Sequence, residues 1–470
     1  MTSTGSRTIK TPSIPYLIVL LIAALCSSGC VTYFSTLAED HTVGIISRPI
    51  TAPVTLVWRA TTLGSETADR LLIRYMNYPR LSRIPIPPVR TNAAYSSSIN
   101  MEHWFARKDI HPTTGHFRLF LNGHTFFPRL HQATRAATNS VDIEVYIFDN
   151  DDVAVEYADI LRQRSTDIKI RILMDGLGCR RGWKTIAPSV SHMPPSTIGN
   201  IGRYLRNETD IQVRRWYNLW LASNHSKLII IDHSTAFLGG MNIGREYRYD
   251  WRDAMVEVTG PVVNELCRSF ANDWNRAHYF SDFFLFRYDK PTKVPAVNDS
   301  KCYVIRTTPI HRRIYRSQIY AANSASSHIY IETPYLWNDR IVYALCKARK
   351  RGVDVRVTVP SEPNVPGAAT ATRVALNTLL DHGVRVFLYP GMTHAKAAIY
   401  DNWACFGSAN LDDLSLHKNT ELNIMTDNKA FVTALENDML LAGQDLSTEI
   451  TEALPLHIWD MLAERIADFL

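Results

Sequence analysis

The stretch that decides the fold is His225-Ser-Lys227-Leu-Ile-Ile-Ile-Asp232, which returns later in the chain as His394-Ala-Lys396-Ala-Ala-Ile-Tyr-Asp401. Both copies place a histidine, a lysine and an aspartate at the same offsets within an apolar, strand-like run. Side chains two positions apart point to the same face of a strand, so we expect each histidine to project beside its lysine. The aspartates lie an odd number of residues from the lysines, which favours structural roles as ion-pair or turn partners.

A glycine turn that contains an asparagine follows each copy of the motif. The first turn is Gly239-Gly240-Met241-Asn242, and the second is Gly407-Ser408-Ala409-Asn410. Because glycine lets the backbone turn closely, we expect each turn to bring its asparagine amide beside the histidine and lysine of the same half.

The repetition extends to the segments around the motifs. Each half contains a strand pattern, a helical pattern and a second strand pattern, at residues 141–148, 158–164 and 168–174 and again at 328–335, 340–351 and 353–359. Strands separated by helices imply parallel βαβ units. We therefore predict that each half is an α/β sandwich.

The composition fits a globular protein of several domains. Of the 470 residues 46% are hydrophobic and 20% are charged, which excludes a disordered polymer and a polytopic membrane protein. The net charge of +6 over this length permits an anionic partner but is too small for a dedicated nucleic-acid coat. The seven cysteines include no CxxC pair, so structural zinc and redox chemistry are not indicated.

The amino terminus has the order of a secretion signal. Arg7 and Lys10 precede an apolar run at 16–26, and Ser27-Ser28-Gly29-Cys30 follows it. This ending resembles a bacterial lipoprotein signal, which makes Cys30 a candidate for lipidation, although Ser27 stands where leucine is usual. An uncleaved membrane anchor and a buried amino-terminal helix are the alternatives. We expect the body of the chain to lie beside lipid.

Two histidines, two lysines and two asparagines indicate a pocket for an anion with tetrahedral oxygens, such as phosphate. A single histidine in a strand is more often structural than catalytic, but the recurrence favours a shared task, since burying an unpaired lysine is costly. The cationic and amide donors can stabilise charge on phosphoryl oxygens. One histidine can then attack phosphorus while the other transfers protons. This chemistry requires no metal and no cofactor.

At this point the chain resembles the phospholipase D superfamily, whose signature is the duplicated HKD motif, over about residues 116–445. Within that superfamily it looks most like bacterial cardiolipin synthases. The supporting residues are Asn242-Ile-Gly-Arg-Glu246-Tyr247, Trp251-Arg252-Asp253, Gly260-Pro261, Asn272-Asp273-Trp274, Thr333-Pro334-Tyr335, Arg351-Gly352-Val353-Asp354-Val355 and Gly407-Ser-Ala-Asn-Leu-Asp412, with Ser415, Asn419 and Glu421.

The resemblance implies two fused phospholipase D-like α/β sandwich domains, related by a pseudo-twofold axis, with the active site at their junction. We divide the chain into a signal or membrane anchor at 1–34, a variable lead-in at 35–115, a first domain at 116–290, a second domain at 300–450 and a carboxy-terminal amphipathic helix at 451–470. The aromatic run from Tyr279 to Phe286 is interpreted as packing between the halves.

The resemblance also implies a covalent phosphohistidine route. His225 is the expected nucleophile and His394 the expected general acid and base. In the family a downstream acidic residue of each half orients the histidine of the other half, and Asp253 and Glu421 match these positions. The residues expected to bind the phosphoryl oxygens are Lys227, Lys396, Asn242 and Asn410, with Ser408 assisting.

Two features depart from the family pattern. The first motif lacks the basic residues that many relatives place around the histidine, and one short segment replaces the familiar pair of amino-terminal transmembrane helices. Both departures leave the catalytic residues unchanged.

The expected function is a membrane-associated phosphatidyl transferase of the bacterial cell envelope, on its extracytoplasmic side, that forms cardiolipin from phosphatidylglycerol. Its expected partners are an anionic phospholipid and a membrane surface, and no protein partner is predicted. The alternatives are hydrolysis of phospholipids to phosphatidic acid, a nuclease of the same superfamily and a non-enzymatic lipid-binding scaffold. The nuclease is disfavoured because the aromatic and basic residues at 214–220 also suit a lipid-headgroup rim.

Overall fold

The computed structural model describes residues 51–90, 100–182, 198–217, 222–277, 301–309 and 311–456. The predicted signal or anchor at 1–34 lies outside these residues, together with Cys30. The same holds for the aromatic run at 279–286 and for residues 457–470 of the predicted final helix.

The first half is built on a sheet of seven strands. In spatial order these are β2 (His116–Leu121), β8 (Ala254–Thr259), β7 (Thr235–Gly239), β6 (Leu228–Ile231), β3 (Ser140–Val145), β4 (Lys169–Asp175) and β5 (Gln212–Trp216). The helical segments of this half are α6 (Gly123–Ala136), α7 (Asp152–Arg164), α8 (Gly176–Gly182), α9 (Ile201–Arg206), η2 (Glu246–Asp250) and α10 (Val262–Arg276).

The second half is built on a sheet of nine strands. In spatial order these are β1 (Thr113–Thr114), β9 (Lys301–Thr307), β15 (Glu421–Thr426), β14 (Trp403–Gly407), β13 (Ala397–Tyr400), β10 (His328–Glu332), β11 (Asp354–Pro360), β12 (Arg385–Tyr389) and β16 (Thr448–Ile450). Its helical segments are α11 (Arg313–Ser324), α12 (Asp339–Lys350), α13 (Pro366–Asp381), η4 (Leu414–Lys418), α14 (Lys429–Ala434), η5 (Leu435–Leu441) and α15 (Ala442–Asp445).

The two sheets share one strand order. Reading from β2 to β5 and from β9 to β12, each position of the first sheet has a counterpart in the second. In both halves three parallel strands pair on one side with an antiparallel hairpin, β6–β7 in the first and β13–β14 in the second. The prediction of two α/β sandwich domains in one chain is therefore confirmed.

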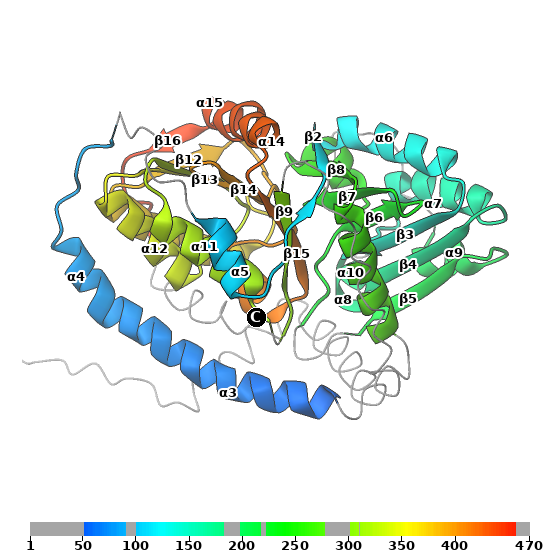
Figure 1. Cartoon of the computed structure of the whole chain (residues 1–470), viewed down its shortest axis with the longest axis horizontal. Coiled ribbons are helices and arrows are strands. Elements are labelled where there is room, and N and C mark those ends of the chain that lie inside the picture. Colours follow the sequence, from blue (N-terminus) through cyan, green and yellow to red (C-terminus); the bar gives the residue numbers. More distant parts are fainter. Residues whose placement is uncertain are drawn as a thin grey trace, which may run out of the picture.

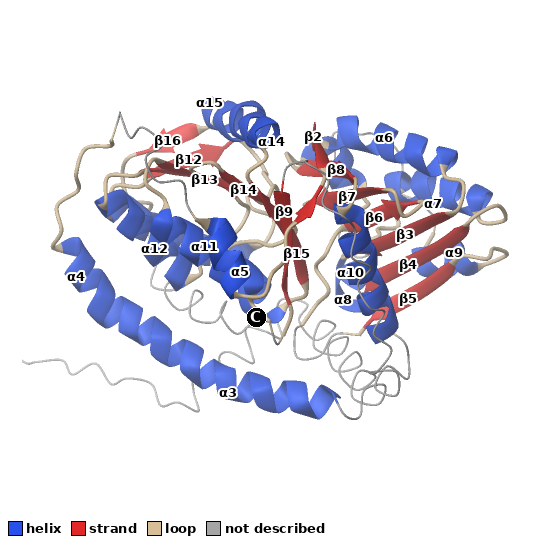
Figure 2. Cartoon of the chain, in the orientation of Figure 1, coloured by secondary structure: helices blue, strands red, loops and turns tan. Residues whose placement is uncertain are grey.

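The motif strands are apolar on both sides because each sheet is covered on both faces (Figures 1 and 2). Ile229 of β6 packs in the core beneath α6 and α7, whereas its neighbour Ile230 belongs to a core that also contains Ile399 of β13. Helix α10 and the α14–η5 segment contribute to this shared core. The two halves are thus joined by apolar packing, and the motif strands lie next to the junction.

A long helical segment precedes the first strand and was not foreseen in the variable lead-in. Helix α3 (Thr51–Leu72) continues through η1 (Ile73–Asn77) into α4 (Tyr78–Ser82), and α5 (Met101–Arg107) follows separately. In Figure 1 the α3–α4 segment runs along the outside of α12. Ion pairs attach it there: Arg74 bonds with Asp339, and Asp69 with Arg340. Over the described part of the chain, no helix combines the length and apolar character needed to span a bilayer.

Candidate active site

The two motifs lie where the central strands begin, at the junction of the halves. The structure places the histidine and lysine of each motif in the extended segment just before β6 or β13, rather than within the strand itself. The apolar residues that follow form the strand. Lys227 and Lys396 are both buried, with 2% and 5% of their surface exposed, so the motif cations sit inside the protein.

His225 is held by a carboxylate from the other half. Its Nδ1 lies 2.9 Å from Oε1 of Glu421, the first residue of β15. The hydroxyl of Ser408 donates a hydrogen bond to the other oxygen of Glu421, and the His225 amide donates to the carbonyl of Thr420 at 2.8 Å. The ring of Tyr146 meets His225 edge-on at 4.7 Å. These contacts fix the imidazole with Nδ1 occupied, which leaves Nε2 for chemistry.

His394 has the reciprocal arrangement. Its Nδ1 lies 2.7 Å from Oδ2 of Asp253, which directly precedes β8 of the first half. The His394 amide donates to the carbonyl of Arg252 at 2.7 Å, and the rings of Tyr247 and Trp251 lie 5.4 and 5.2 Å away. Each half therefore supplies the carboxylate that orients the imidazole of the other, as the family resemblance implies.

The basic side chains of the two motifs influence one another electrostatically. Burial lowers the pKa of His394, and the positive charges of the two motif lysines and of His225 lower it further. Burial likewise lowers the pKa of His225 to about 4, against the opposing charge of Glu421. Both shifts favour the uncharged imidazoles near neutral pH.

The two lysines are poised to receive an anion. Burial lowers the pKa of Lys227 to about 7 and that of Lys396 to about 8, with Glu421 and Asp253 respectively opposing this most strongly. Each ammonium group donates a hydrogen bond to the carbonyl of its own motif histidine, at 2.7 Å for Lys227. An anion entering the site would restore the charge on both lysines.

The two orienting carboxylates differ in ionisation. Burial opposes ionisation of Glu421, but its interactions with His225, Lys227 and Ser408 together outweigh this, so the pKa of Glu421 is lowered. Burial raises the pKa of Asp253 to about 7, although Lys396 counteracts part of this shift. Glu421 is thus the better partner for an imidazole that gains positive charge.

The asparagines of the glycine turns lie in the buried interior of the same region. The side-chain oxygen of Asn242 accepts a hydrogen bond from the Ile147 amide at 3.1 Å, and its side chain also bonds with Tyr247. Asn410 bonds with the carboxyl of Asp412. The Asn242 amide is therefore held at both ends, whereas the side-chain oxygen of Asn410 has no hydrogen-bond partner among the described residues.

The motif aspartates lie at the far ends of the motif strands. Asp232 and Asp401 have positive φ values of 52° and 50°, and each occupies the turn that follows its strand. The carboxylate of Asp232 accepts hydrogen bonds from the backbone amides of residues 138–140, and Asp401 does the same with residues 326–328. This geometry fits turn partners that anchor the start of β3 and of β10, away from the histidines.

Sequence reasoning missed a second pair of carboxylates, Glu144 and Glu332. They occupy equivalent positions, because Glu144 pairs with Leu228 and Glu332 with Ala397, the residues directly after the motif lysines. Each is almost fully buried and accepts a hydrogen bond from the residue before the motif histidine, Glu144 from Asn224 and Glu332 from Thr393. The available signal was a glutamate near the end of the corresponding apolar strand in both halves.

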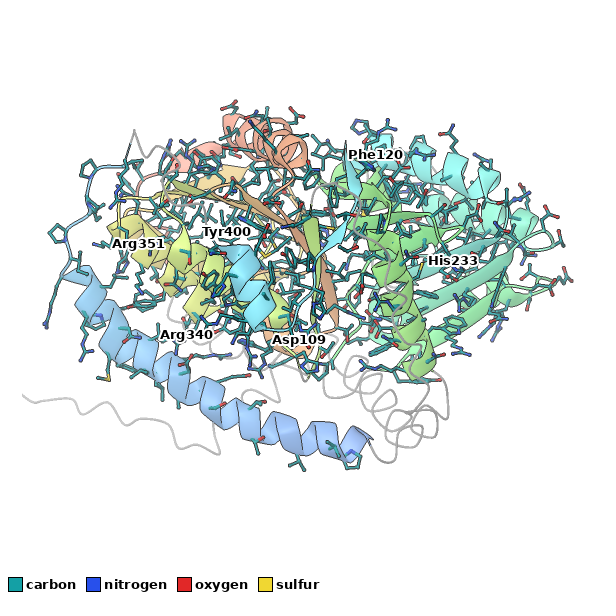
Figure 3. The ribbon with its side chains drawn as sticks, in the orientation of Figure 1. Asp109, Phe120, His233, Arg340, Arg351 and Tyr400 are labelled. Atoms are coloured by element: carbon teal, nitrogen blue, oxygen red, sulfur yellow. The ribbon has the colours of Figure 1, made fainter. Side chains whose placement is uncertain are left out.

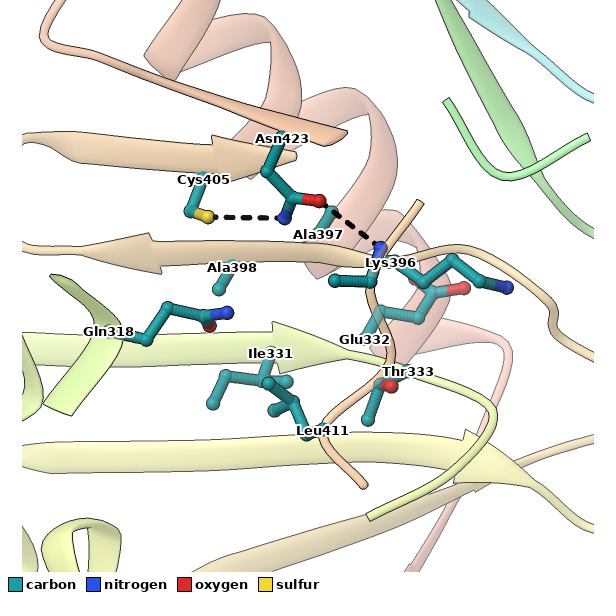
Figure 4. A pocket seen from close by; sticks show the side chains of 11 residues that line it. Gln318, Ile331, Glu332, Thr333, Lys396, Ala397, Ala398, Cys405, Leu411 and Asn423 are labelled. Atoms are coloured by element: carbon teal, nitrogen blue, oxygen red, sulfur yellow. Dashed lines mark hydrogen bonds between the residues drawn. The ribbon is translucent and has the colours of Figure 1, made fainter. Parts of the chain in front are cut away.

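Glu332 also joins the two halves. Oε1 of Glu332 accepts a hydrogen bond from Nε of Arg252 at 2.9 Å, and Nη2 of Arg252 donates to the carbonyl of Met439 at 2.7 Å. Figure 4 shows Glu332 close to Lys396 and Thr333 at the edge of a small cavity. Arg252 therefore ties the segment that carries Asp253 to the second half.

Within the described ranges, one further group of acidic side chains has metal-binding potential. Carboxylate oxygens of Asp149, Asp151 and Glu246 all lie within 4.8 Å of one another. Burial raises the pKa of Asp149 to about 7 and that of Glu246 to about 8, so these groups are partly protonated near neutral pH. Neither motif contributes to this group.

Comparison with known proteins identifies relatives that match most of this chain. Cardiolipin synthase A of Pseudomonas entomophila is 30% identical over 372 residues, which cover 74% of this chain and 73% of the relative. The cardiolipin synthase of Halalkalibacterium halodurans is 31% identical over 339 residues, which cover 69% and 65%. The crystal structure of phosphatidylserine synthase from Haemophilus influenzae has the same fold, with a TM-score of 0.60 at 10% identity over 78% of this chain and 96% of that one.

A family model supports the same conclusion. The model described as "Cardiolipin synthase, PLD-like domain" matches residues 130–274 and 319–440, which together make up more than half of the chain. Each matched region contains one copy of the histidine–lysine–aspartate motif. The chain therefore belongs to the cardiolipin synthase branch of the phospholipase D superfamily.

Proposed function

We propose that this protein is a membrane-associated phosphatidyl transferase that moves a phosphatidyl group from one phosphatidylglycerol to the hydroxyl of another, forming cardiolipin and glycerol. The observation that carries the proposal is the reciprocal arrangement of two imidazoles. Each is held through Nδ1 by a carboxylate of the opposite half, and the buried Lys227 interacts electrostatically with both carboxylates and with Lys396. Family membership supports the choice of a phospholipid substrate.

In the first step Nε2 of His225 attacks the phosphorus of the first lipid, and the bond from phosphorus to the glycerol headgroup oxygen breaks. His394 donates a proton to that oxygen, and glycerol leaves. The product is a phosphatidyl group bound covalently to His225. Glu421, which stays ionised, stabilises the positive charge on the phosphorylated imidazole.

In the second step the hydroxyl of another phosphatidylglycerol replaces glycerol. His394 accepts the proton of this hydroxyl, its oxygen attacks phosphorus, and the bond to His225 breaks to release cardiolipin. Asp253 orients His394 through both steps because it contacts Nδ1. The two histidines thus alternate between bonding to phosphorus and moving protons.

The phosphodiester prepares the site for this chemistry. Its negative charge favours the protonated forms of Lys227, Lys396 and His394, whose pKa values burial has lowered. The lysines then neutralise the phosphoryl oxygens, and His394 carries the proton needed by the leaving glycerol. Asn242 and Asn410 supply amide donors, and Ser408 assists through its bond to Glu421.

The amino-terminal signal supports a place in the bacterial cell envelope, on the extracytoplasmic side. The apolar run at 16–26 and the candidate lipidation residue Cys30 would keep the body of the chain at the membrane. Metabolic labelling with a fatty-acid analogue tests lipidation, and Cys30→Ser is the matched control.

The decisive experiment gives the purified full chain phosphatidylglycerol labelled in its glycerol headgroup and in its acyl chains. We expect labelled cardiolipin and free glycerol in equal amounts, and neither product from His225→Ala or His394→Ala. His124→Ala, which changes an exposed histidine of α6, should retain full activity. If phosphatidic acid were the sole lipid product, the protein would be a hydrolase and not a transferase. Full activity of either motif variant would refute the mechanism.

A further inference from the structure

The exposed apolar side chains of this protein are concentrated in one segment. Among the described residues, twelve large hydrophobic side chains are exposed, and eight of them lie between residues 54 and 86. They are Val54, Val57, Leu71, Leu72, Tyr75, Met76, Ile84 and Ile86. Soluble surfaces rarely gather apolar side chains in this way without a partner.

Four of these side chains form a continuous row, which we name the 71–76 stripe: Leu71, Leu72, Tyr75 and Met76. Their spacing places them on one face of the α3–η1 helix. Ile73 is fully buried, and the neighbouring Arg74 bonds with Asp339 of the body. The stripe therefore faces away from the protein, and Tyr75 is the most exposed of the four at 68%.

The same segment is basic. Residues 71–90 contain four arginines and no aspartate or glutamate. Arg80 and Arg83 are exposed just beyond the stripe, close to the exposed Ile84 and Ile86. Apolar side chains flanked by arginine are typical of helices that lie in the interface of an anionic bilayer, with apolar groups among the acyl chains and cations at the headgroups.

We propose that residues 71–86 dock on the surface of an anionic phospholipid bilayer and hold the protein against it. The proposal rests on the proposed function, which supplies a lipid substrate and an apolar anchor at 16–26 of the same chain. A second copy of the protein fits this face less well, because residues 71–86 contain three arginines and no acidic residue, so the segment offers no negative charge to the same segment of another copy.

Docking through this segment also positions the catalytic site. Arg70, next to the stripe, lies 3.0 Å from the carboxylate of Asp413, and Asp413 follows the Asn410–Asp412 turn of the second motif. In Figure 3 Arg340 lies near α3, whereas Arg351 lies at the other end of α12, near the chain that follows α4. The segment thus contacts α12 along its length, and its orientation on a bilayer sets that of the second half.

The first experiment compares two matched double variants of the full chain. Leu71→Gln/Leu72→Gln removes two exposed leucines from the stripe, and Leu446→Gln/Leu456→Gln removes two exposed leucines elsewhere. On phosphatidylglycerol in vesicles, we expect the stripe variant to lose about tenfold in activity and the control to lose less than about twofold. On six-carbon phosphatidylglycerol dissolved as monomers, both variants should match the unchanged protein.

The second experiment needs no turnover. Hydrogen–deuterium exchange of His225→Ala should show protection of residues 67–86 on addition of phosphatidylglycerol vesicles, and no protection with phosphatidylcholine vesicles. Protection without vesicles that grows with protein concentration would assign the face to a second copy and overturn the proposal. Equal vesicle activity of the two double variants would also overturn it.

These readouts separate the docking surface from the reaction. Protection of 67–86 in a protein that makes no cardiolipin from either substrate would remove the proposed function and keep the docking surface. Cardiolipin synthesis without protection, and without any difference between the double variants, would keep the proposed function and remove the docking surface.

Discussion

The ion pair between Arg252 and Glu332 gives a sharp test of how the halves are held together beside His394. Glu332 has no exposed surface, and the side chain of Arg252 is 9% exposed. The change Glu332→Gln keeps the shape and the acceptor oxygen but leaves the guanidinium buried without its countercharge. Removing one partner of a buried pair costs about 3–5 kcal/mol, and we expect about 3 kcal/mol because Arg252 keeps its bond to the Met439 carbonyl.

The double variant should lose much less stability than the sum of the losses in the two single variants. Arg252→Met alone leaves the Glu332 charge buried, whereas Arg252→Met/Glu332→Gln leaves no charge at all. We expect the double variant to be about 2 kcal/mol more stable than additivity predicts. Urea unfolding followed by circular dichroism measures the four proteins, with the first transition compared because a chain of two domains need not unfold in one step.

The single change Glu332→Gln should also shift the pH profile of kcat/KM. The pKa of Asp253 is raised to about 7, mainly by burial. The negative charge of Glu332 also contributes to this rise. Removing that charge lowers the pKa of Asp253, so the acid limb of kcat/KM should move to lower pH in Glu332→Gln. Two results together would refute the reasoning. The stability losses of the single variants would add to that of the double variant within about 0.5 kcal/mol, and the acid limb of kcat/KM would stay at the same pH in Glu332→Gln.

Three other predictions concern residues of the two motifs and their partners. Phosphate binding at pH 8 should take up protons, because Lys227 has a pKa of about 7 and is mostly neutral there until an anion arrives; calorimetry in two buffers of different ionisation enthalpy measures the uptake, which should fall in Lys227→Met. Glu421→Gln should lower turnover by about 10³-fold, since the charge behind the His225 imidazole is lost, whereas Ser408→Ala should cost less than tenfold. Asp401→Asn should destabilise the fold by about 2 kcal/mol, because its amide nitrogen would face the backbone amides of residues 326–328; its kcat per folded molecule should stay within about twofold, and a larger loss of kcat would assign this aspartate a chemical role.

The fold class could be predicted because the same sequence pattern occurs in both halves of the chain. Periodicity placed strands close to β3, β4, β10 and β11, and the recurrence of His225 and Lys227 as His394 and Lys396 indicated two equivalent halves. The strand boundaries were less accurate, since the motif residues precede β6 and β13 rather than lying within them. Local alternation does not show where an extended segment stops pairing with its neighbours.

Two features could not be predicted because they depend on distant partners. The residues next to Glu144 in the sequence do not indicate its role. Its contact with the first motif follows only from the register of β3 on β6. Helix α3 is attached largely through ion pairs such as Asp69 with Arg340, formed between segments far apart in the chain. A surface that is polar where it meets the body and apolar where it faces outward gives a misleading pattern to any reading of sequence alone.

The exchange of carboxylates between the halves has a consequence for how such an enzyme can be divided. A fragment with only the first lobe would keep His225 but lose Glu421, and a fragment with only the second would keep His394 but lose Asp253. Neither lobe by itself can assemble a complete catalytic unit. A fragment with one motif would need a second copy, related to it by a dyad, to supply the missing carboxylate.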